Sequence, residues 1–190
     1  MRYVSATEAG GMLRGGEVGL VPTETVVGLV AGEAGLLRLF EIKGRDPDKP
    51  IALLCGTAEE AFALSREVPP LACLLADRFW PGPLTLVLDA QDGTVGVRVP
   101  AHPVMRAVLA AYRGPLHATS ANLSGEPAPY ALEDVGPAIR DAADFAIWGE
   151  PGNGEASAVV DLSGGKIHVL RPTTELTEQR LSRLVTRATG

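Results

Sequence analysis

The sequence predicts an α/β protein built on an open, twisted mixed β-sheet with flanking helices. Short apolar runs bounded by Gly, Pro and Asp, typical of buried strands, occur among longer segments whose apolar residues recur at helical spacing. The two kinds of segment mix irregularly, which favours a mixed sheet over a strict series of strand–helix–strand units. The chain has 190 residues, of which 46% are hydrophobic and 21% charged, and a single domain over 1–190 is expected.

Strands and helices alternate through the first half of the sequence, and two of the helices carry recognisable caps. Residues 34–44 have apolar side chains at helical spacing, and Gly44 is placed to close that helix. Thr57 and Glu60 form a capping-box pattern that starts a helix over 57–67. The other elements predicted here are a buried strand at 16–22, an extended turn at Asp46–Pro47, an apolar strand at 50–56 and a helix at 69–79.

Strands dominate the second half of the sequence. The apolar runs at 84–90 and 95–100 are predicted to be neighbouring strands joined by a turn at 91–93. Residues 102–114 are predicted to form a helix closed by glycine, and 115–120 a strand that runs into a polar turn. The remaining predicted elements are a helix near 131–141 and strands at 144–148, 156–162 and 166–171.

Composition argues against several classes of function. A formal net charge of −6 disfavours a broad electrostatic grip on nucleic acid, although a local basic pocket is compatible with it. No apolar signal-peptide segment or run approaching ~18 apolar residues is present, so a cytoplasmic protein without membrane contact is expected. Cys55 and Cys73 are expected to be reduced core thiols. The three histidines lack the spacing of a zinc site, so no metal ligands are predicted.

Lysine is distributed unevenly along the chain. Arginine occurs fourteen times and lysine three times, yet the run EIKGRDPDKP at 41–50 holds both Lys43 and Lys49. A lysine in the last turn of a helix is favoured by the helix dipole, and Lys49 and Arg45 could pair with the two aspartates of the run. The alternative is a phosphate-binding edge, for which the compact ammonium of lysine is well suited.

Small polar residues follow several predicted strands, and two arginines lie in or after apolar ones. Thr23 and Thr25 in PTETVVG, like the polar residues of TSANLSG, bring hydroxyl and amide groups to strand ends, where turns and caps are the structural alternative. Arg98 lies within VGVRVP and Arg171 follows KIHVL, where a guanidinium needs an anion, a salt bridge or solvent. No GxxxxGK[ST] loop is present. The residues alone therefore predict a pocket suited to an anionic ligand.

Six stretches of the sequence occur in a distinctive order. They are PTETVVGL, KGRDPDKP, FWPGPLTLVL, VGVRVPAHP, ATSANLSGEP, and SAVVDL followed by VLRP. Together they resemble the YrdC-like domain family, the threonylcarbamoyl-AMP synthases, over roughly residues 5–175. The linker and additional C-terminal domain of longer members have no counterpart here, so the resemblance implies the short, single-domain form.

The resemblance implies an enzyme that makes threonylcarbamoyl-adenylate and pyrophosphate from L-threonine, bicarbonate and ATP, with Mg²⁺ accompanying ATP. A downstream tRNA threonylcarbamoyl-transferase machinery would then use the adenylate to modify an adenosine of tRNA. The sheet would surround a positively charged central cavity, in which Lys43 and Arg45 would be catalytic. The implied threonine ligands are Thr25, Arg98, Ser120 and Ser157, and the implied ATP ligands are Lys43, Arg45, Lys49, Thr94, Asn122 and Arg171.

Such a reaction brings two anions together, so a cationic cavity would catalyse it by positioning and electrostatics. Two alternatives stay open. Val27, Ala156 and Ala158 differ from residues common in the family near the threonine pocket, which motivates a related adenylation of another carbamate or acyl anion. A non-catalytic double-stranded RNA-binding module would use the same concave basic surface.

Overall fold

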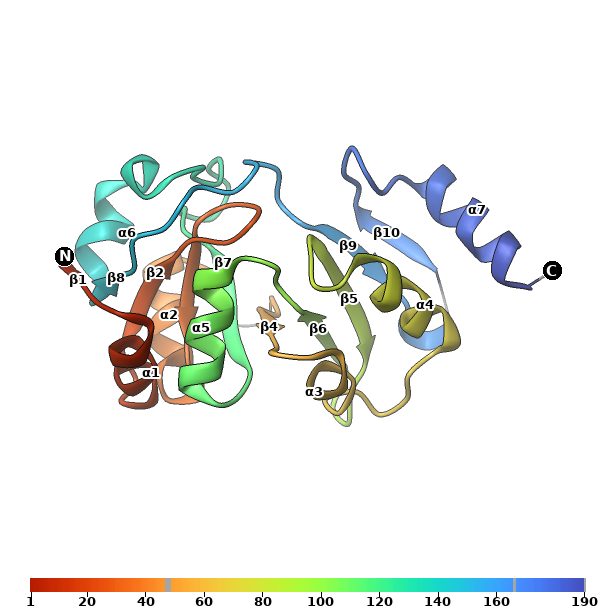
Figure 1. Cartoon of the computed structure of the whole chain (residues 1–190), viewed down its shortest axis with the longest axis horizontal. Coiled ribbons are helices and arrows are strands. Elements are labelled where there is room, and N and C mark those ends of the chain that lie inside the picture. The colour runs from red at the N-terminus through yellow and green to blue at the C-terminus, as the bar shows by residue number, and fades with distance from the viewer. Residues whose placement is uncertain (47–48, 166, 190) are drawn as a thin grey trace.

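The computed structural model describes residues 1–46, 49–165 and 167–189. Within these residues, ten strands form one sheet in the order β1-β8-β2-β3-β7-β4-β6-β5-β9-β10, with helices along it (Figure 1). Both kinds of pairing occur, since β2 runs antiparallel to β3 whereas β4 runs parallel to β6. The predicted α/β class, with an open mixed sheet and flanking helices, is confirmed.

The strands are short and the helices run at most to a few turns. The strands are β1 (Arg2–Tyr3), β2 (Val18–Val21), β3 (Gly28–Ala31), β4 (Ala52–Leu54), β5 (Leu84–Asp89), β6 (Thr94–Arg98), β7 (Leu116–Ser120), β8 (Phe145–Ala146), β9 (Ala158–Asp161) and β10 (His168–Arg171). The α-helices are α1 (Ala6–Arg14), α2 (Leu36–Lys43), α3 (Ala58–Phe62), α4 (Pro70–Phe79), α5 (Pro103–Tyr112), α6 (Pro137–Ala142) and α7 (Glu178–Thr189). Short 3₁₀ turns are η1 (Glu33–Gly35), η2 (Leu132–Asp134) and η3 (Ser163–Gly165).

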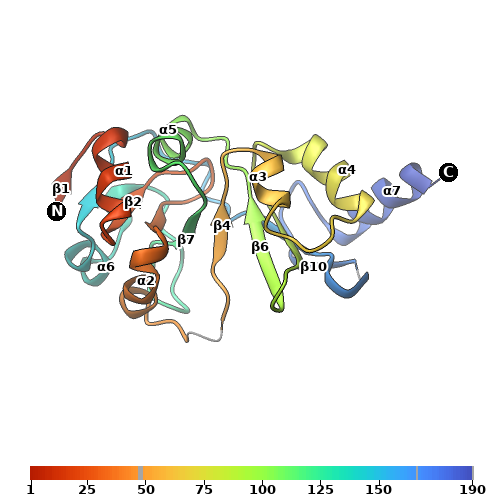
Figure 2. The same ribbon diagram turned by 90° about the horizontal axis from the view of Figure 1, so that it is seen from below.

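The sheet divides into two halves that have separate cores. In the first half, α1 and α5 cover one face, and α2 and α6 cover the other (Figures 1 and 2). Alternation along β3 supplies both cores, because Leu29 packs with α2 and α6 whereas Val30 packs with α1 and α5. In the second half, β5, β6 and β9 pack against α4 and α7. The halves join where β7 pairs antiparallel with β4.

Two predicted caps were tested by the structure. Gly44 ends α2 in the left-handed conformation, with φ 58°, as the sequence predicts. The Thr57 hydroxyl accepts the Glu60 N–H at 3.1 Å, but the Glu60 carboxylate accepts the N–H of Gly56 rather than that of Thr57. The predicted capping box is therefore only half formed. Helix α3 also ends earlier than predicted, because the Arg66 N–H donates to the Asp89 carbonyl of a neighbouring strand.

Three other predictions need correction, and two elements were not predicted. Helix α5 ends at Arg113, which takes the left-handed φ of 65° that the sequence assigned to a glycine. Cys73 is exposed on α4 and is not a core thiol, whereas Cys55 is buried and burial raises the pKa of its thiol to about 12. The helix predicted near 131–141 is divided into η2 and α6, because Pro137 cannot continue a helix and begins a new one. Helix α1 and strand β3 were not predicted.

An extended turn was also predicted at Asp46–Pro47, and Pro47 lies outside the described residues.

Candidate active site

A cavity of about 730 Å³ is lined by residues from both halves of the sheet. It receives side chains from β4, β5, β6, β7, β9 and β10, and from the loops that follow β2, α2 and β7. The sequence-predicted site residues that line it are Thr25, Lys43, Arg45, Lys49, Thr94, Arg98, Ser120, Asn122, Ser157 and Arg171. The fold thus gathers every predicted ligand residue around one space, although the chain separates the first from the last by almost 150 positions.

The charged residues of this lining are mostly basic. Lys43, Arg45, Lys49, Arg98 and Arg171 line the cavity, and Asp46 is the acidic residue among the described lining residues. The formal net charge of the protein is −6, so this local excess of positive charge is opposite in sign to the charge of the whole chain. A cavity with this lining favours anionic ligands.

Lys43 is the last residue of α2, and it is buried, with 3% of its surface exposed. Its Nζ donates to the Ser120 carbonyl at 2.6 Å, to Ser120 Oγ at 3.2 Å and to Asn122 Oδ1 at 2.9 Å. Asn122 is oriented for this because its Nδ2 donates to the carbonyls of Leu123 and Glu126. All three acceptors are neutral, so the ammonium is bonded but its charge is not cancelled. Burial, and then the charge of Arg45, lower the pKa of Lys43 to about 8.

Arg45 is held by the chain that follows it. Its Nε donates to the Lys49 carbonyl at 3.1 Å and its Nη2 to the Pro50 carbonyl at 3.0 Å. These two carbonyls therefore hold the guanidinium, and the side chain of Lys49 is at the exposed edge of the cavity. The structural alternative for these two residues, pairing with nearby aspartates, involves Asp48, which lies outside the described residues.

Arg98 is buried at the end of β6, and its contacts differ from those of Lys43. Its Nη2 donates to Glu24 Oε1 at 2.7 Å and to Thr25 Oγ1 at 3.2 Å, and its Nε donates to the Gly82 carbonyl at 3.1 Å. Burial by itself would raise the pKa of Glu24, but the charge and hydrogen bond of Arg98, together with backbone N–H donors, outweigh burial and hold that pKa below its usual value. The salt bridge that the sequence allowed for Arg98 and its place in the cavity are therefore both present.

Arg171 lies near Arg98 on the lining of the cavity and is anchored through Ser157. Its Nε donates to the Ser157 carbonyl at 2.6 Å, and its Nη2 donates to Ser157 Oγ at 3.1 Å. Ser157 Oγ in turn shares a 2.9 Å hydrogen bond with Thr85 Oγ1. Burial, and then the nearby charge of Arg98, lower the pKa of Arg171. Two guanidinium groups close enough to repel each other define a place where an anion would be stabilised.

Sequence reasoning missed two residues of this site. Thr85 lines the cavity from β5, but in the sequence it is one polar residue in an apolar strand. Glu24 lies between the two threonines of PTETVVG, and only those threonines were selected. The rule that a buried arginine needs a carboxylate partner would have directed attention to Glu24.

Val27 and Ala158 do not line the cavity, which corrects the expectation that they lie beside a ligand there. Val27 is 1% exposed in the core beneath α2 and α6, and Ala158 is 1% exposed in the core of the other half. Ala156 does line the cavity. Of the three positions that motivated a different substrate, only Ala156 therefore adjoins the cavity.

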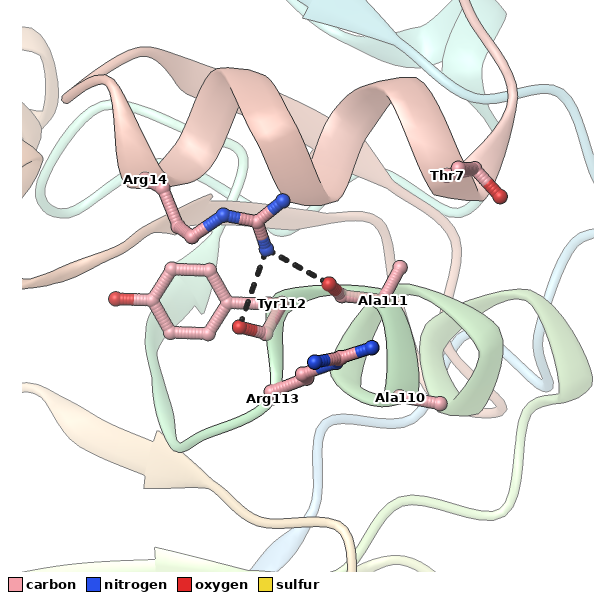
Figure 3. Close-up of a pocket in the computed structure, with 6 residues that line it drawn as sticks. All are labelled: Thr7, Arg14, Ala110, Ala111, Tyr112 and Arg113. Atoms are coloured by element: carbon pink, nitrogen blue, oxygen red, sulfur yellow. Dashed lines mark hydrogen bonds between the residues drawn. The ribbon is translucent and has the colours of Figure 1, made fainter.

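A second concavity, of about 610 Å³, lies between α1 and α5 (Figure 3). Figure 3 shows Arg14 reaching from α1 to the end of α5, where its Nη1 donates to the carbonyls of Ala111 at 2.7 Å and Tyr112 at 3.3 Å. Arg14 thus supplies a donor to carbonyls that a helix end leaves unpaired. None of the sequence-predicted ligands lines this concavity, so we assign it a packing role.

Across the part of the chain that the structure describes, no group of three or more His, Cys, Asp or Glu residues is arranged to hold a metal ion. Across the same residues, no helix is long and apolar enough to cross a bilayer.

The fold and the cavity define an α/β protein with a cationic site between the two halves of a mixed sheet. Comparison with known proteins gives its family: residues 11–173 match the Sua5_yciO_yrdC model, described as "Telomere recombination". The chain belongs to this family.

Relatives and a solved structure support the same family. The chain is 38% identical over 178 residues to the threonylcarbamoyl-AMP synthase of Pyrococcus abyssi, covering 86% of this chain and 52% of the relative. It is 32% identical over 167 residues to that of Chromohalobacter salexigens, covering 81% of this chain and 90% of the relative. The crystal structure of P. abyssi Sua5 complexed with L-threonine has a TM-score of 0.87 at 34% identity, over 95% of this chain and 57% of that one. The chain thus spans about half the length of the P. abyssi relative.

Proposed function

We propose that the protein synthesises threonylcarbamoyl-adenylate from L-threonine, bicarbonate and ATP, with release of pyrophosphate. The observation that carries this proposal is the single cavity into which the fold gathers all ten implied ligand residues, with basic side chains in excess. Relatives named threonylcarbamoyl-AMP synthase, and a relative solved with L-threonine, give the proposal its substrate. The product would serve a tRNA-modifying machinery in the cytoplasm.

Threonine is assigned to the part of the cavity around Arg98. The guanidinium would bind the threonine carboxylate, and the hydroxyls of Thr25, Ser120 and Ser157 would hydrogen-bond the amino acid. Ser120 also accepts a hydrogen bond from Lys43, so the two substrate subsites adjoin at this residue.

ATP is assigned to the part of the cavity around Lys43 and Arg45. Arg45 would bind phosphate oxygens directly, and Lys43 would exchange one of its neutral acceptors on Ser120 or Asn122 for a phosphate oxygen. The further ligands are Lys49, Thr94, Asn122 and Arg171. Mg²⁺ enters as part of the MgATP substrate, and a site with few carboxylates suits an ion that is bound largely by phosphates and water.

The reaction first joins the threonine nitrogen to the carbon of bicarbonate, with loss of water, to give a carbamate. A carbamate oxygen then attacks the α-phosphorus of ATP, forming the P–O bond of the adenylate as the bond to pyrophosphate breaks. Carbamate and triphosphate are both anions, so the basic lining would reduce their repulsion and align them. Positioning and electrostatics account for the catalysis that we assign to Lys43 and Arg45.

The test is pyrophosphate release by the purified protein with ATP, bicarbonate and each amino acid in turn. We expect release that requires threonine and that falls about ten- to a hundredfold in Arg45→Ala, because one charge-assisted phosphate contact is worth about 1.5–3 kcal/mol. Arg113→Ala, an exposed arginine outside the cavity, is the matched control and should retain activity.

Other results would replace this function with one of the alternatives. Release that prefers another amine or acyl substrate would mean a related adenylation, in which Ala156 would be the first residue to re-examine. Binding of double-stranded RNA with a steep salt dependence, and no pyrophosphate release, would mean an RNA-binding module.

A further inference from the structure

Glu24 lies behind the cavity, and both of its carboxylate oxygens are occupied by donors of the protein. Oε1 accepts from Arg98 Nη2 at 2.7 Å, and Oε2 accepts from the backbone N–H of His102 at 3.1 Å. His102 is the N-cap of α5, so the carboxylate also lies at the positive end of a helix. Its side chain is 19% exposed, and it is not among the residues that line the cavity.

Arg98 is held on one side only. Its Nε and Nη2 are bonded to Gly82, Glu24 and Thr25, whereas its Nη1 makes no hydrogen bond to the residues that the structure describes. Nη1 carries two of the five N–H donors of a guanidinium. Since Arg98 itself lines the cavity, these donors are left for a ligand there.

The backbone of Glu24 is also fixed. The chain at 149–154 crosses the loop that carries it, where Asn153 N–H donates to the Glu24 carbonyl at 2.9 Å and Gly154 N–H donates to the Thr25 carbonyl at 2.8 Å. Gly152 approaches so closely that a Cβ there would lie 2.5 Å from the Glu24 carbonyl carbon. Side chain and backbone contacts therefore both restrict the position of this carboxylate.

We propose that Glu24 is the positioning residue of the amino-acid site: it fixes the plane of the Arg98 guanidinium so that Nη1 meets the substrate carboxylate. The identity of that carboxylate as threonine rests on the proposed function. A carboxylate suits this task because two N–H groups converge on it and each needs an acceptor. Glutamine offers one acceptor oxygen and one NH₂ group, so in Glu24→Gln either Arg98 or His102 would face another donor.

This role is distinguishable from simple charge compensation. If Glu24 acted only by weakening the positive field of Arg98, its neutralisation would tighten the binding of threonine. If it positions Arg98, the same change loosens the guanidinium and weakens that binding. Glu24→Asp separates the two further, because it keeps the charge but is too short to reach both Arg98 and His102.

The experiment compares wild type, Glu24→Gln and Glu24→Asp, with Glu33→Gln as the control. Glu33 accepts from His117 in the same kind of contact, but its side chain is 84% exposed and outside the cavity. L-threonine binding is measured by calorimetry, and the KM values for threonine and ATP by pyrophosphate release. We expect both Glu24 variants to raise the threonine Kd and KM about tenfold and to leave the ATP KM within about twofold, as loss of one oriented charged contact implies.

The Nη2–H signal of Arg98, the group that donates to Glu24, provides in ¹⁵N NMR of the ligand-free protein a readout that does not depend on the substrate. Hydrogen exchange at this position should become at least about tenfold faster in Glu24→Gln, as loss of a charged contact implies. Unchanged exchange overturns the positioning role, as does a tighter threonine complex in Glu24→Gln or an equal rise of both KM values. Absence of threonine binding by wild type, with faster Arg98 exchange in the variant, would refute the proposed function and retain the positioning role.

Discussion

Lys43 and Arg98 are two buried cations on the lining of one cavity, and the protein treats their charges in opposite ways. Lys43 is 3% exposed and donates to three neutral oxygens of Ser120 and Asn122. Arg98 is 7% exposed and is paired with the carboxylate of Glu24. Both are buried and hydrogen-bonded, but only Arg98 has its charge balanced by a carboxylate among the residues that the structure describes.

The difference indicates what each side of the cavity contributes to binding. At Lys43 the positive charge is retained against the cost of burial, and the lowered pKa of about 8 records that cost. This charge can be balanced by an incoming anion such as a phosphate. At Arg98 the charge is already balanced, so the residue contributes directed N–H donors more than net potential. We infer that the Lys43 side, the proposed nucleotide site, attracts its ligand by charge, and that the Arg98 side, the proposed amino-acid site, orients its ligand by geometry.

Arg98→Met should have the largest effect on stability and on threonine binding, because it removes the salt bridge between Arg98 and Glu24. Glu24 would keep a largely buried charge with the His102 N–H as its donor, so we expect a loss of about 3 kcal/mol in stability, the lower end of the range for broken buried pairs. Chemical denaturation should therefore show a clear loss of unfolding free energy together with the loss of threonine binding. A variant as stable as wild type would mean that Glu24 does not depend on Arg98.

Lys43→Met likewise removes a buried cation, but one without a carboxylate partner in the described part of the chain, so its effect on stability should be small. The loss of three hydrogen bonds is offset by removal of a desolvated charge, and water from the cavity can reach the three acceptors. We expect unfolding free energy within about 1 kcal/mol of wild type but a fall of up to about a hundredfold in kcat/KM for ATP. Equal destabilisation by Lys43→Met and Arg98→Met would remove the contrast between the two cations.

Gly152→Ala tests how far the paired side depends on the chain that crosses it. The new Cβ would lie 2.5–2.6 Å from backbone atoms of Thr23, Glu24 and Thr25, so the loop has to move. We expect the free energy of unfolding to fall by about 1–3 kcal/mol, as for other overpacked sites. The KM for threonine should rise from its wild-type value by a larger factor than the KM for ATP. Gly11→Ala in α1 is the matched control, because its Cβ would meet nothing nearer than 4.0 Å and should not destabilise the protein.

Much of the fold could be predicted from local pattern, and the errors have physical causes. Gly44 was found because a left-handed helix end selects glycine, whereas α5 ends at Arg113, a choice that local pattern does not indicate. Helix α1 was missed although Ser5 and Glu8 form a complete capping box, because Leu13 is the one large apolar side chain among the residues that it buries. Strand β3 is buried on both faces and only four residues long, so it has no alternation to detect.

The site could be predicted only where residue type and family pattern coincide. Cations and hydroxyls were selected because their chemistry suits an anionic ligand, and the cavity contains all of them. The partner of Arg98 was not selected, since Glu24 is 74 positions away and only the pairing of the fold brings them together. The tertiary structure decides which cation is paired with a carboxylate, and sequence spacing does not predict that pairing.

The pH dependence of the proposed ATP site provides the smallest expected effect, and it should appear on the Lys43 side alone. Because the pKa of Lys43 is lowered to about 8, its charge is lost through a range in which Arg98 stays protonated. We expect the ATP KM of wild type to rise about fourfold between about pH 7 and pH 8.5, and that of Lys43→Met to stay flat. A rise of the same size in Lys43→Met would assign the titration to another group.

Stability should follow the same titration with a defined sign. The folded protein releases the Lys43 proton near pH 8 and the unfolded chain near its ordinary pKa of 10.5, so the unfolded state holds more protons between these values. The contribution of Lys43 to the free energy of unfolding therefore rises with pH across this window. Denaturation of wild type and Lys43→Met at several pH values isolates that contribution as the difference between the two curves. A difference that falls or stays constant above pH 8 would show that the buried ammonium carries no burial cost, and the distinction between the two cations would then rest on Glu24 alone.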